Sequence, residues 1–376
     1  MRPTDQDRHG GNIYNRQIRY DFSSNINPLG IPAFALKKLQ DEAVRCERYP
    51  DPEYRELKTA IARMEQVPQE WVICGNGASE LIYALPRALA MRKERPVRAL
   101  IPQPSFSEYE RAVQAAGGHA AALLLKKENG FRITEDILDE LTPDTDLLCL
   151  CNPANPIGNR LDEALLAKIL RQCREAQIVV LLDECFLPFC EDYESASGKR
   201  VIKEYPQLFV LNAFTKIYAM PGIRLGYGMC SDIMLLAGLR EQIPEWSVSQ
   251  SAQTAGTSIA GYRVREPRWD YMRRTRELIR EQREEMAGKL RELGMQVFPP
   301  TADFICFYSR IPLFEELEKA GILIRTCGNY RGPVSYTHLD VYKRQVYHRV
   351  HRQQPDEENR KLDGDSPWIP LCVGIK

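Results

Sequence analysis

The chain has no excess of charge of either sign, since its 51 lysine and arginine residues are matched by 51 aspartate and glutamate residues. Proteins that bind nucleic acid or other polyanions usually carry a basic surplus, so we expect no such partner. The sequence also lacks an apolar run long enough to span a membrane, and its polar start is not that of a signal peptide. These absences predict a cytoplasmic protein without a membrane or nucleic-acid partner.

Closely spaced cysteine pairs are missing as well. The eleven cysteines are scattered, include no CxxC pair, and mostly lie in apolar runs, as Cys149, Cys151 and Cys306 do. This distribution favours buried free thiols over disulfides or a zinc site. Three of the five histidines lie in the C-terminal tail, so we expect no metal site.

What the chain does contain is a lysine, Lys216, shortly after an apolar run at 208–211 that is typical of a buried strand. Arg224 follows eight positions later, just before a glycine-containing strand start. A lysine in this position can form a Schiff base with an aldehyde cofactor, and the arginine can hold the phosphate of that cofactor. Without other signals, a lysine followed by an arginine more often marks surface charge.

A glycine-rich turn at 75–80 leads from a strand-like segment, 71–74, into a helical run at 81–90. Such a turn offers backbone N–H groups and the positive end of a helix dipole to a phosphate. The alternative interpretation is an ordinary strand-to-helix turn, which is about equally frequent for so short a motif.

Two polar motifs end other apolar strands. The asparagine- and proline-rich segment 152–158 follows the apolar run 147–151, at the carboxyl end of a strand, where α/β folds bind ligands. Asp183 follows the run 178–182 and can pair with a protonated pyridine nitrogen. The alternatives are a proline-rich turn for the first motif and a helix N-cap for Asp183.

Together the four elements resemble fold-type I pyridoxal-phosphate enzymes of the class I/II aminotransferase superfamily, over residues 9–332. The resemblance implies an α/β fold with a mostly parallel sheet flanked by helices, plus a smaller α+β domain. It implies pyridoxal 5'-phosphate as the cofactor. It also implies a homodimer, because Tyr49 matches a tyrosine that reaches the phosphate of the neighbouring subunit.

The resemblance assigns further roles by position. Lys216 matches the Schiff-base lysine, Asp183 the partner of the pyridine nitrogen, and Asn155 the donor to the ring hydroxyl. Phe106 matches the residue that stacks on the ring. The phosphate-binding positions correspond to Gly77, Ala78, Ser79, Thr215 and Arg224.

Length and patterning predict two domains, for which 376 residues are sufficient. Between 71 and 230, apolar strand candidates alternate with amphipathic helices, which indicates a parallel sheet covered on both faces. A long charged helix is expected from about 264 to 293, followed by short strands. We therefore divide the chain into an N-terminal arm with part of the small domain (1–47), a large cofactor-binding domain (48–263), a small C-terminal domain (264–333) and a tail (334–376).

The N-terminal segments 9–12 and 21–30 closely resemble those of the threonine-phosphate decarboxylases of cobalamin synthesis. The nearest relatives of that group, the histidinol-phosphate aminotransferases, usually have a tyrosine where this chain has Phe186. Phenylalanine cannot donate a hydrogen bond to the ring oxygen, and it is the residue typical of the decarboxylases. Simple core packing is the alternative explanation for Phe186.

This resemblance implies decarboxylation of L-threonine O-3-phosphate to (R)-1-amino-2-propanol O-2-phosphate. A fixed anchor for the substrate phosphate would turn the carboxylate perpendicular to the cofactor ring, so that the bond to the carboxylate breaks. Besides Asn155, the candidate substrate ligands are His9, Asn27, Arg325 and, for the carboxylate, Arg349. A terminal arm without such a role is the alternative for His9.

The segment 334–345 fits nothing in this family, and we expect it to be a foreign insert within a corrupted or chimeric tail, 334–376. It shows no clean two-residue alternation, so it offers no buried face. Two further functions stay open. One is a histidinol-phosphate or related aminotransferase, and the other is a catalytically dead cofactor-binding protein, which the damaged tail suggests.

Overall fold

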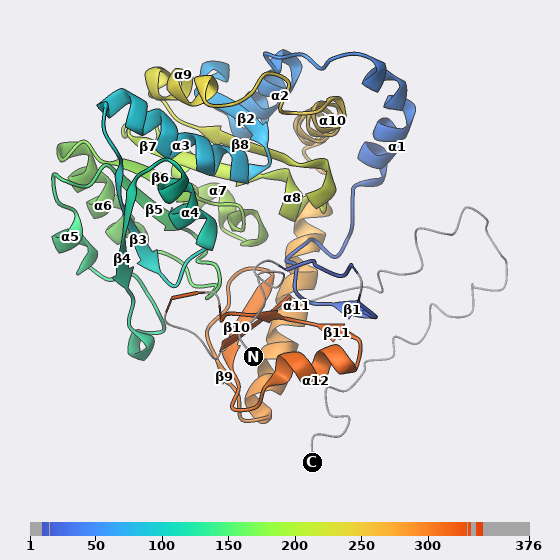
Figure 1. Ribbon diagram of the computed structural model, residues 1–376. Coiled ribbons are helices and arrows are strands. Elements are labelled where there is room, and N and C mark those ends of the chain that lie inside the picture. Colours follow the sequence, from blue (N-terminus) through green and yellow to red (C-terminus); the bar gives the residue numbers. More distant parts are fainter. Residues whose placement is uncertain (1–9, 15, 329, 332–335, 341–376) are drawn as a thin grey trace.

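A seven-stranded sheet forms the centre of the larger domain in the computed structural model, which describes residues 10–14, 16–328, 330–331 and 336–340 (Figure 1). β8 runs antiparallel to both of its neighbours, β2 and β7, and all other strand pairs of this sheet are parallel. In spatial order the strands are β2 (Val72–Asn76), β8 (Leu225–Met229), β7 (Leu208–Ala213), β6 (Val179–Asp183), β5 (Leu147–Cys151), β3 (Arg98–Gln103) and β4 (His119–Leu124).

Helices cover both faces of this sheet, which is why its strands read as continuous apolar runs. Along β7, Phe209 and Leu211 pack into one hydrophobic cluster, while Leu208 and Val210 pack into the other. The first cluster includes α3 (Ala78–Lys93), α4 (Ser107–Ala115) and α9 (Ile233–Glu241); the second includes α2 (Arg55–Glu65), α6 (Glu163–Glu175) and α10 (Gln250–Arg265). The prediction of a mostly parallel sheet flanked by helices is confirmed.

Short helices fill the connections. The α-helical ones are α5 (Ile137–Glu140), α7 (Tyr193–Ala196) and α8 (Phe214–Ile217). The 3₁₀ helices are Ala43–Glu47, Gln69–Trp71, Lys127–Asn129, Leu187–Phe189, Gly198–Arg200 and Pro221–Ile223.

The smaller domain lies at the end of the long helix α11 (Tyr271–Glu292), which descends from the large domain (Figure 1). Its antiparallel sheet has the order β12 (Arg325–Thr326), β13 (Tyr336–Asp340), β10 (Phe304–Tyr308), β9 (Gln296–Val297), and α12 (Leu313–Lys319) packs beside it. The N-terminal arm joins this domain, because β1 (Tyr20–Asp21) pairs in parallel with β11 (Ile322–Leu323). Helix α1 (Ala33–Asp41) then packs against α10 in the large domain, with Phe34 stacked on Tyr262.

The expectation of one helix from 264 to 293 is wrong at its start. Helix α10 continues to Arg265, and α11 begins only at Tyr271. Pro267 lies between them and explains the break, because a proline has no N–H to donate and disfavours helical backbone in the residue before it.

The expectation that the segment from 334 offers no buried face is also wrong. Residues 336–340 form β13, which pairs with all of β10 and with β12 in the middle of the small sheet, and Thr337 is buried. Strand pairing uses backbone groups, which a segment without apolar alternation still has. The small sheet therefore extends beyond residue 333. The foreign origin of 334–345 stays a prediction, and residues 341–376 lie outside the described part of the chain.

Candidate active site

Lys216 lies in α8, directly after the buried strand β7. Its Nζ lies 5.7 Å from the centroid of the Phe186 ring, which follows β6 on the neighbouring strand. The backbone carbonyl of Lys216 accepts a hydrogen bond from the Asn27 amide, 3.1 Å long. The N-terminal arm thereby supports the turn that presents the lysine.

Asp183 ends β6 and is buried, yet its carboxylate has two donors. The hydroxyl of Tyr109 donates to Oδ2 at 2.6 Å, and the backbone N–H of Cys185 donates to Oδ1 at 2.9 Å. Burial, followed by the charge of Asp183, raises the pKa of the Tyr109 hydroxyl well above its ordinary value, so Tyr109 remains a proton donor. These contacts hold the carboxylate in one orientation.

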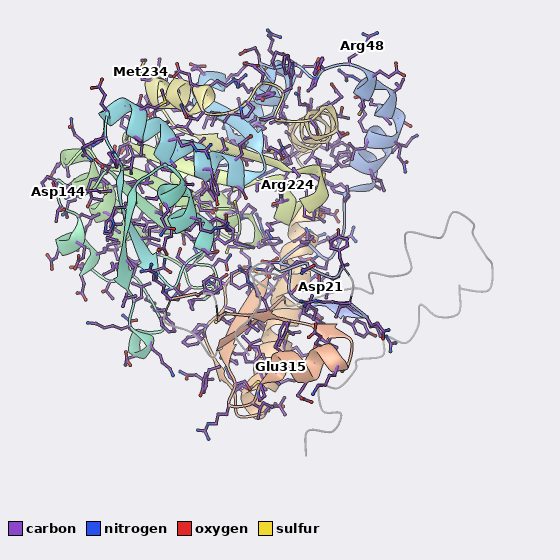
Figure 2. The ribbon with its side chains drawn as sticks, in the orientation of Figure 1. Asp21, Arg48, Asp144, Arg224, Met234 and Glu315 are labelled. Atoms are coloured by element: carbon purple, nitrogen blue, oxygen red, sulfur yellow. The ribbon has the colours of Figure 1, made fainter. Side chains whose placement is uncertain are left out.

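The start of α3 and Arg224 lie side by side and form what we call the cradle. Gly77 has a φ of 75° and comes directly before α3, whose first residues, Ala78 and Ser79, present backbone N–H groups. A Cβ on Gly77 would collide with the guanidinium of Arg224, and the Gly77 N–H donates to the Arg224 carbonyl at 3.0 Å. Figure 2 shows Arg224 beside α8, on the side of the large domain that faces the small one.

The arrangement fits pyridoxal phosphate. The cradle provides helix N–H groups and a guanidinium for a phosphate, and Asp183 provides a fixed anionic acceptor for a ring nitrogen. Lys216 provides an amine for the aldehyde. The missing Cβ at Gly77 lets the Arg224 guanidinium lie directly against the start of α3.

The remaining ring-binding candidates lie on the same edge of the sheet. Asn155 is buried in the loop after β5, and the hydroxyl of Tyr330 donates to its Oδ1 at 3.2 Å. Phe106 comes directly before α4 and contacts Tyr109 edge to face, with 5.7 Å between ring centroids. Thr215, next to Lys216, is buried.

The candidate substrate ligands differ in whether their side-chain donors already have hydrogen-bond partners. The Nε and Nη2 atoms of Arg325 are buried and have no hydrogen-bond partner in the described part of the chain. Arg325 lines a cavity together with Asn12 and Ser23 of the N-terminal arm. An anionic substrate group would satisfy these two atoms.

Asn27, by contrast, has no donor left for a substrate. Its Nδ2 donates to the Ile217 carbonyl and to Thr275 Oγ1, both at 2.7 Å, and its Oδ1 accepts from the Leu29 amide at 3.0 Å. Both Nδ2 hydrogens of Asn27 therefore join the arm to α8 and α11, and its role as a substrate ligand stays a prediction.

Of the three remaining predicted residues, the structure describes only Tyr49. Tyr49 is 80% exposed and packs on Trp246, with ring centroids 4.7 Å apart. His9 and Arg349 lie outside the described residues.

The structure adds two residues that sequence reasoning missed, Tyr109 and Tyr330. Tyr109 stands three residues after Phe106, a spacing that places both on one side of a helix and could have suggested it. For Tyr330 no local signal exists, since its contact is 175 residues away.

A buried network of charged residues links α2 to β8 and to the segment after β6. Glu65 accepts hydrogen bonds from Tyr227 at 2.7 Å and from Lys199 at 2.8 Å. Although burial opposes ionisation, the charge of Lys199 leaves the pKa of Glu65 below its ordinary value. Glu184 is also fully buried; it accepts from Ser197 Oγ at 2.6 Å and from the Gly198 N–H at 2.8 Å. Burial raises its pKa to about 7.

Comparison with known proteins gives the following similarities. Residues 18–360 match the family model described as aminotransferase class I and II. The chain is 36% identical over 337 residues to the threonine-phosphate decarboxylase of Salmonella typhimurium, covering 86% of this chain and 89% of that protein. It is 29% identical to the histidinol-phosphate aminotransferase of Symbiobacterium thermophilum, covering 83% of each chain.

Among solved structures, the histidinol-phosphate aminotransferase of Clostridium acetobutylicum superimposes with a TM-score of 0.77. It is 28% identical, and the match covers 86% of this chain and 94% of that one. Across the described residues, no helix combines the length and apolarity that crossing a bilayer requires.

Proposed function

The chain belongs to the aminotransferase class I and II family, and we propose that within this family it is a pyridoxal-phosphate-dependent decarboxylase of L-threonine O-3-phosphate that serves cobalamin biosynthesis. The observation that carries the proposal is the 36% identity to a threonine-phosphate decarboxylase over most of both chains. The histidinol-phosphate aminotransferases are more distant, at 29% identity. The position of Phe186 under Lys216 Nζ supports the same assignment, because a hydroxyl is missing there.

The residues proposed to hold the cofactor lie along one edge of the sheet. The cradle of Gly77, Ala78, Ser79, Thr215 and Arg224 would take the phosphate. Asp183 would accept the proton of the pyridine nitrogen, and Tyr109 would keep its carboxylate in place through the 2.6 Å hydrogen bond. Phe106 would stack on the ring, and Asn155 would donate to the ring oxygen.

Pyridoxal phosphate, when bound, supplies an electron sink for the pair released when a bond to the substrate Cα breaks. The protein decides which bond breaks by holding the substrate in one orientation. Arg325 would bind an anionic group of the substrate through its two buried nitrogen atoms. Lys216 Nζ would return a proton to Cα from its position over the apolar Phe186 ring.

The finer assignments follow from the same family. We propose a homodimer in which Tyr49 reaches the phosphate of the partner subunit, a small phosphorylated amino acid as substrate, and a cytoplasmic location. The exposure of Tyr49 supports the first point, because a single chain leaves this ring largely uncovered.

The decisive experiment incubates the protein with L-threonine O-3-phosphate and pyridoxal phosphate and follows carbon dioxide, with and without a 2-oxo acid. We expect carbon dioxide without the 2-oxo acid. A product that forms only with the 2-oxo acid, from histidinol phosphate, would instead support the aminotransferase. Protein that binds the cofactor and releases nothing from either substrate would support the catalytically dead alternative.

Replacement of the lysine tests the cofactor assignment directly. Wild-type protein should show the visible absorbance of lysine-bound pyridoxal phosphate, and Lys216→Ala should lose it. Lys203→Ala, an exposed lysine of the same domain, is the control and should keep the colour. A colourless wild type that gains no colour from added cofactor would refute the proposed function.

A further inference from the structure

Tyr330 connects the two domains at the candidate active site. It follows β12 of the small domain and is 3% exposed. Its hydroxyl donates to Oδ1 of Asn155, which lies in the loop after β5 of the large domain, over 3.2 Å. A residue of the small domain thus donates a hydrogen bond to the side chain proposed to bind the cofactor ring.

The ring of Tyr330 also contacts a proposed substrate ligand. The guanidinium carbon of Arg325 lies 5.3 Å from the ring centroid, a distance typical of a cation–π contact. Among the described residues, the thiols Cys327, Cys306 and Cys151 also act on the Tyr330 hydroxyl. Burial raises the pKa of the Tyr330 hydroxyl, so it stays protonated and remains a donor.

The contact determines how the carboxamide of Asn155 is turned. An asparagine side chain has one acceptor oxygen and one donor nitrogen, on opposite sides. With Oδ1 occupied by Tyr330, Nδ2 must point the other way, and no other side-chain hydrogen bond of Asn155 is formed within the described residues. Phe186 cannot supply a second donor, because it has no hydroxyl.

We propose that Tyr330 is a positioning residue: its hydroxyl turns Asn155 so that Nδ2 donates to the ring oxygen of the cofactor, while its ring holds Arg325 against the substrate. The inference rests on the proposed function, since it concerns the same cofactor. In this proposal, the small domain helps to bind the ring oxygen of the cofactor, a role that a tyrosine hydroxyl at position 186 would otherwise have.

The test is Tyr330→Phe, which removes the hydroxyl and keeps the ring. Loss of one hydrogen bond to the ring oxygen should raise the dissociation constant of pyridoxal phosphate about three- to tenfold. The ring oxygen would then hold its negative charge with less support and bind the nearby imine proton more strongly. The pH midpoint of the visible band should therefore move upward by about half a unit.

Two comparisons separate positioning from a general loss of stability. Tyr193→Phe removes another buried hydroxyl, one that donates to Glu65 at 3.1 Å, and should leave the midpoint unchanged. Asn155→Ala should shift the midpoint at least as much as Tyr330→Phe does. Adding Tyr330→Phe to Asn155→Ala should cause no further shift, because Tyr330 acts through Asn155.

Additive shifts in the double variant, or a Tyr330→Phe protein with wild-type affinity and midpoint, would overturn the inference while leaving the proposed function intact. A wild type that binds no pyridoxal phosphate would overturn both.

Discussion

At the scale of single residues, two adjacent carboxylates at the end of β6 have opposite surroundings. Asp183 points to the candidate active site, where Tyr109 and a backbone N–H hold it. Glu184 comes next in the chain, and its side chain is buried beside Ser197 and Gly198 instead. Successive side chains near a strand end point in different directions, so one carboxylate can serve the site while the other is structural.

Glu184→Gln should reduce the loss of folding stability that the protein shows as the pH rises. The pKa of Glu184 is raised from 4.5 to about 7 in the folded protein, mainly by burial. The stability contributed by its neutral form is therefore fully present below pH 4.5 and is lost as the pH rises toward 7. Glutamine stays neutral; its Oε1 can accept from the Gly198 N–H, and its Nε2 can donate to Ser197 Oγ, which reverses that hydrogen bond. The difference in free energy of unfolding between the variant and wild type should therefore change with pH. Between pH 4.5 and pH 8 it should shift in favour of the variant by up to about 3 kcal/mol.

Urea unfolding at pH 4.5 and pH 8 would measure this change. Glu204→Gln, at an exposed position, is the control and should show no such gain. An equal difference between Glu184→Gln and wild type at both pH values would contradict the prediction.

At the scale of elements, the turn from β2 into α3 depends on one glycine. Gly77 has a positive φ, and a Cβ there would meet the guanidinium of Arg224 from the start of β8. The turn, the helix start and the arginine therefore depend on the same glycine. It adopts the positive φ of the turn, and its missing Cβ leaves room for the arginine side chain.

Gly77→Ala should weaken pyridoxal phosphate binding about tenfold or more, because Arg224 must move away from the cradle. It should also destabilise the fold by about 1–2 kcal/mol, because alanine is strained at positive φ. Gly222→Ala is the matched control, since its Cβ would meet nothing within 4 Å and its φ is not positive. Cofactor titration and urea unfolding measure the two effects; Gly77→Ala protein that equals Gly222→Ala in both would show that the cradle tolerates a side chain.

At the scale of the whole molecule, the exposed Tyr49 and Trp246 rings mark the surface where we place the partner subunit. The two rings pack on each other, yet Tyr49 is 80% and Trp246 45% exposed. A shared site would cover them and bring the Tyr49 hydroxyl to the partner's cofactor phosphate.

Tyr49→Phe should loosen the cofactor by about 1 kcal/mol, the usual scale of one lost hydrogen bond. Tyr14→Phe, at another exposed tyrosine, should have no effect. Sedimentation should show a dimer for wild type and for both variants. A monomer that binds the cofactor tightly would contradict a site shared across a dimer.

The sequence by itself determined the class of fold and the order of the motifs around Lys216, Asp183 and Asn155. These features are local: an apolar strand and the polar residue that ends it are neighbours in the chain, so spacing is enough to recognise them. Parallel strands then bring their carboxyl ends to one edge, which predicts that the motifs meet.

Only the tertiary structure decided which distant side chains support those residues. Tyr109 reaches Asp183 across 74 residues, Asn27 reaches Thr275 across 248, and Tyr330 reaches Asn155 across 175. Neither the contacts of Asn27 nor the strand at 336–340 could be read from the sequence, for the same reason. A hydrogen bond between remote segments depends on how helices and sheets pack, and the pattern of either segment alone does not contain that information.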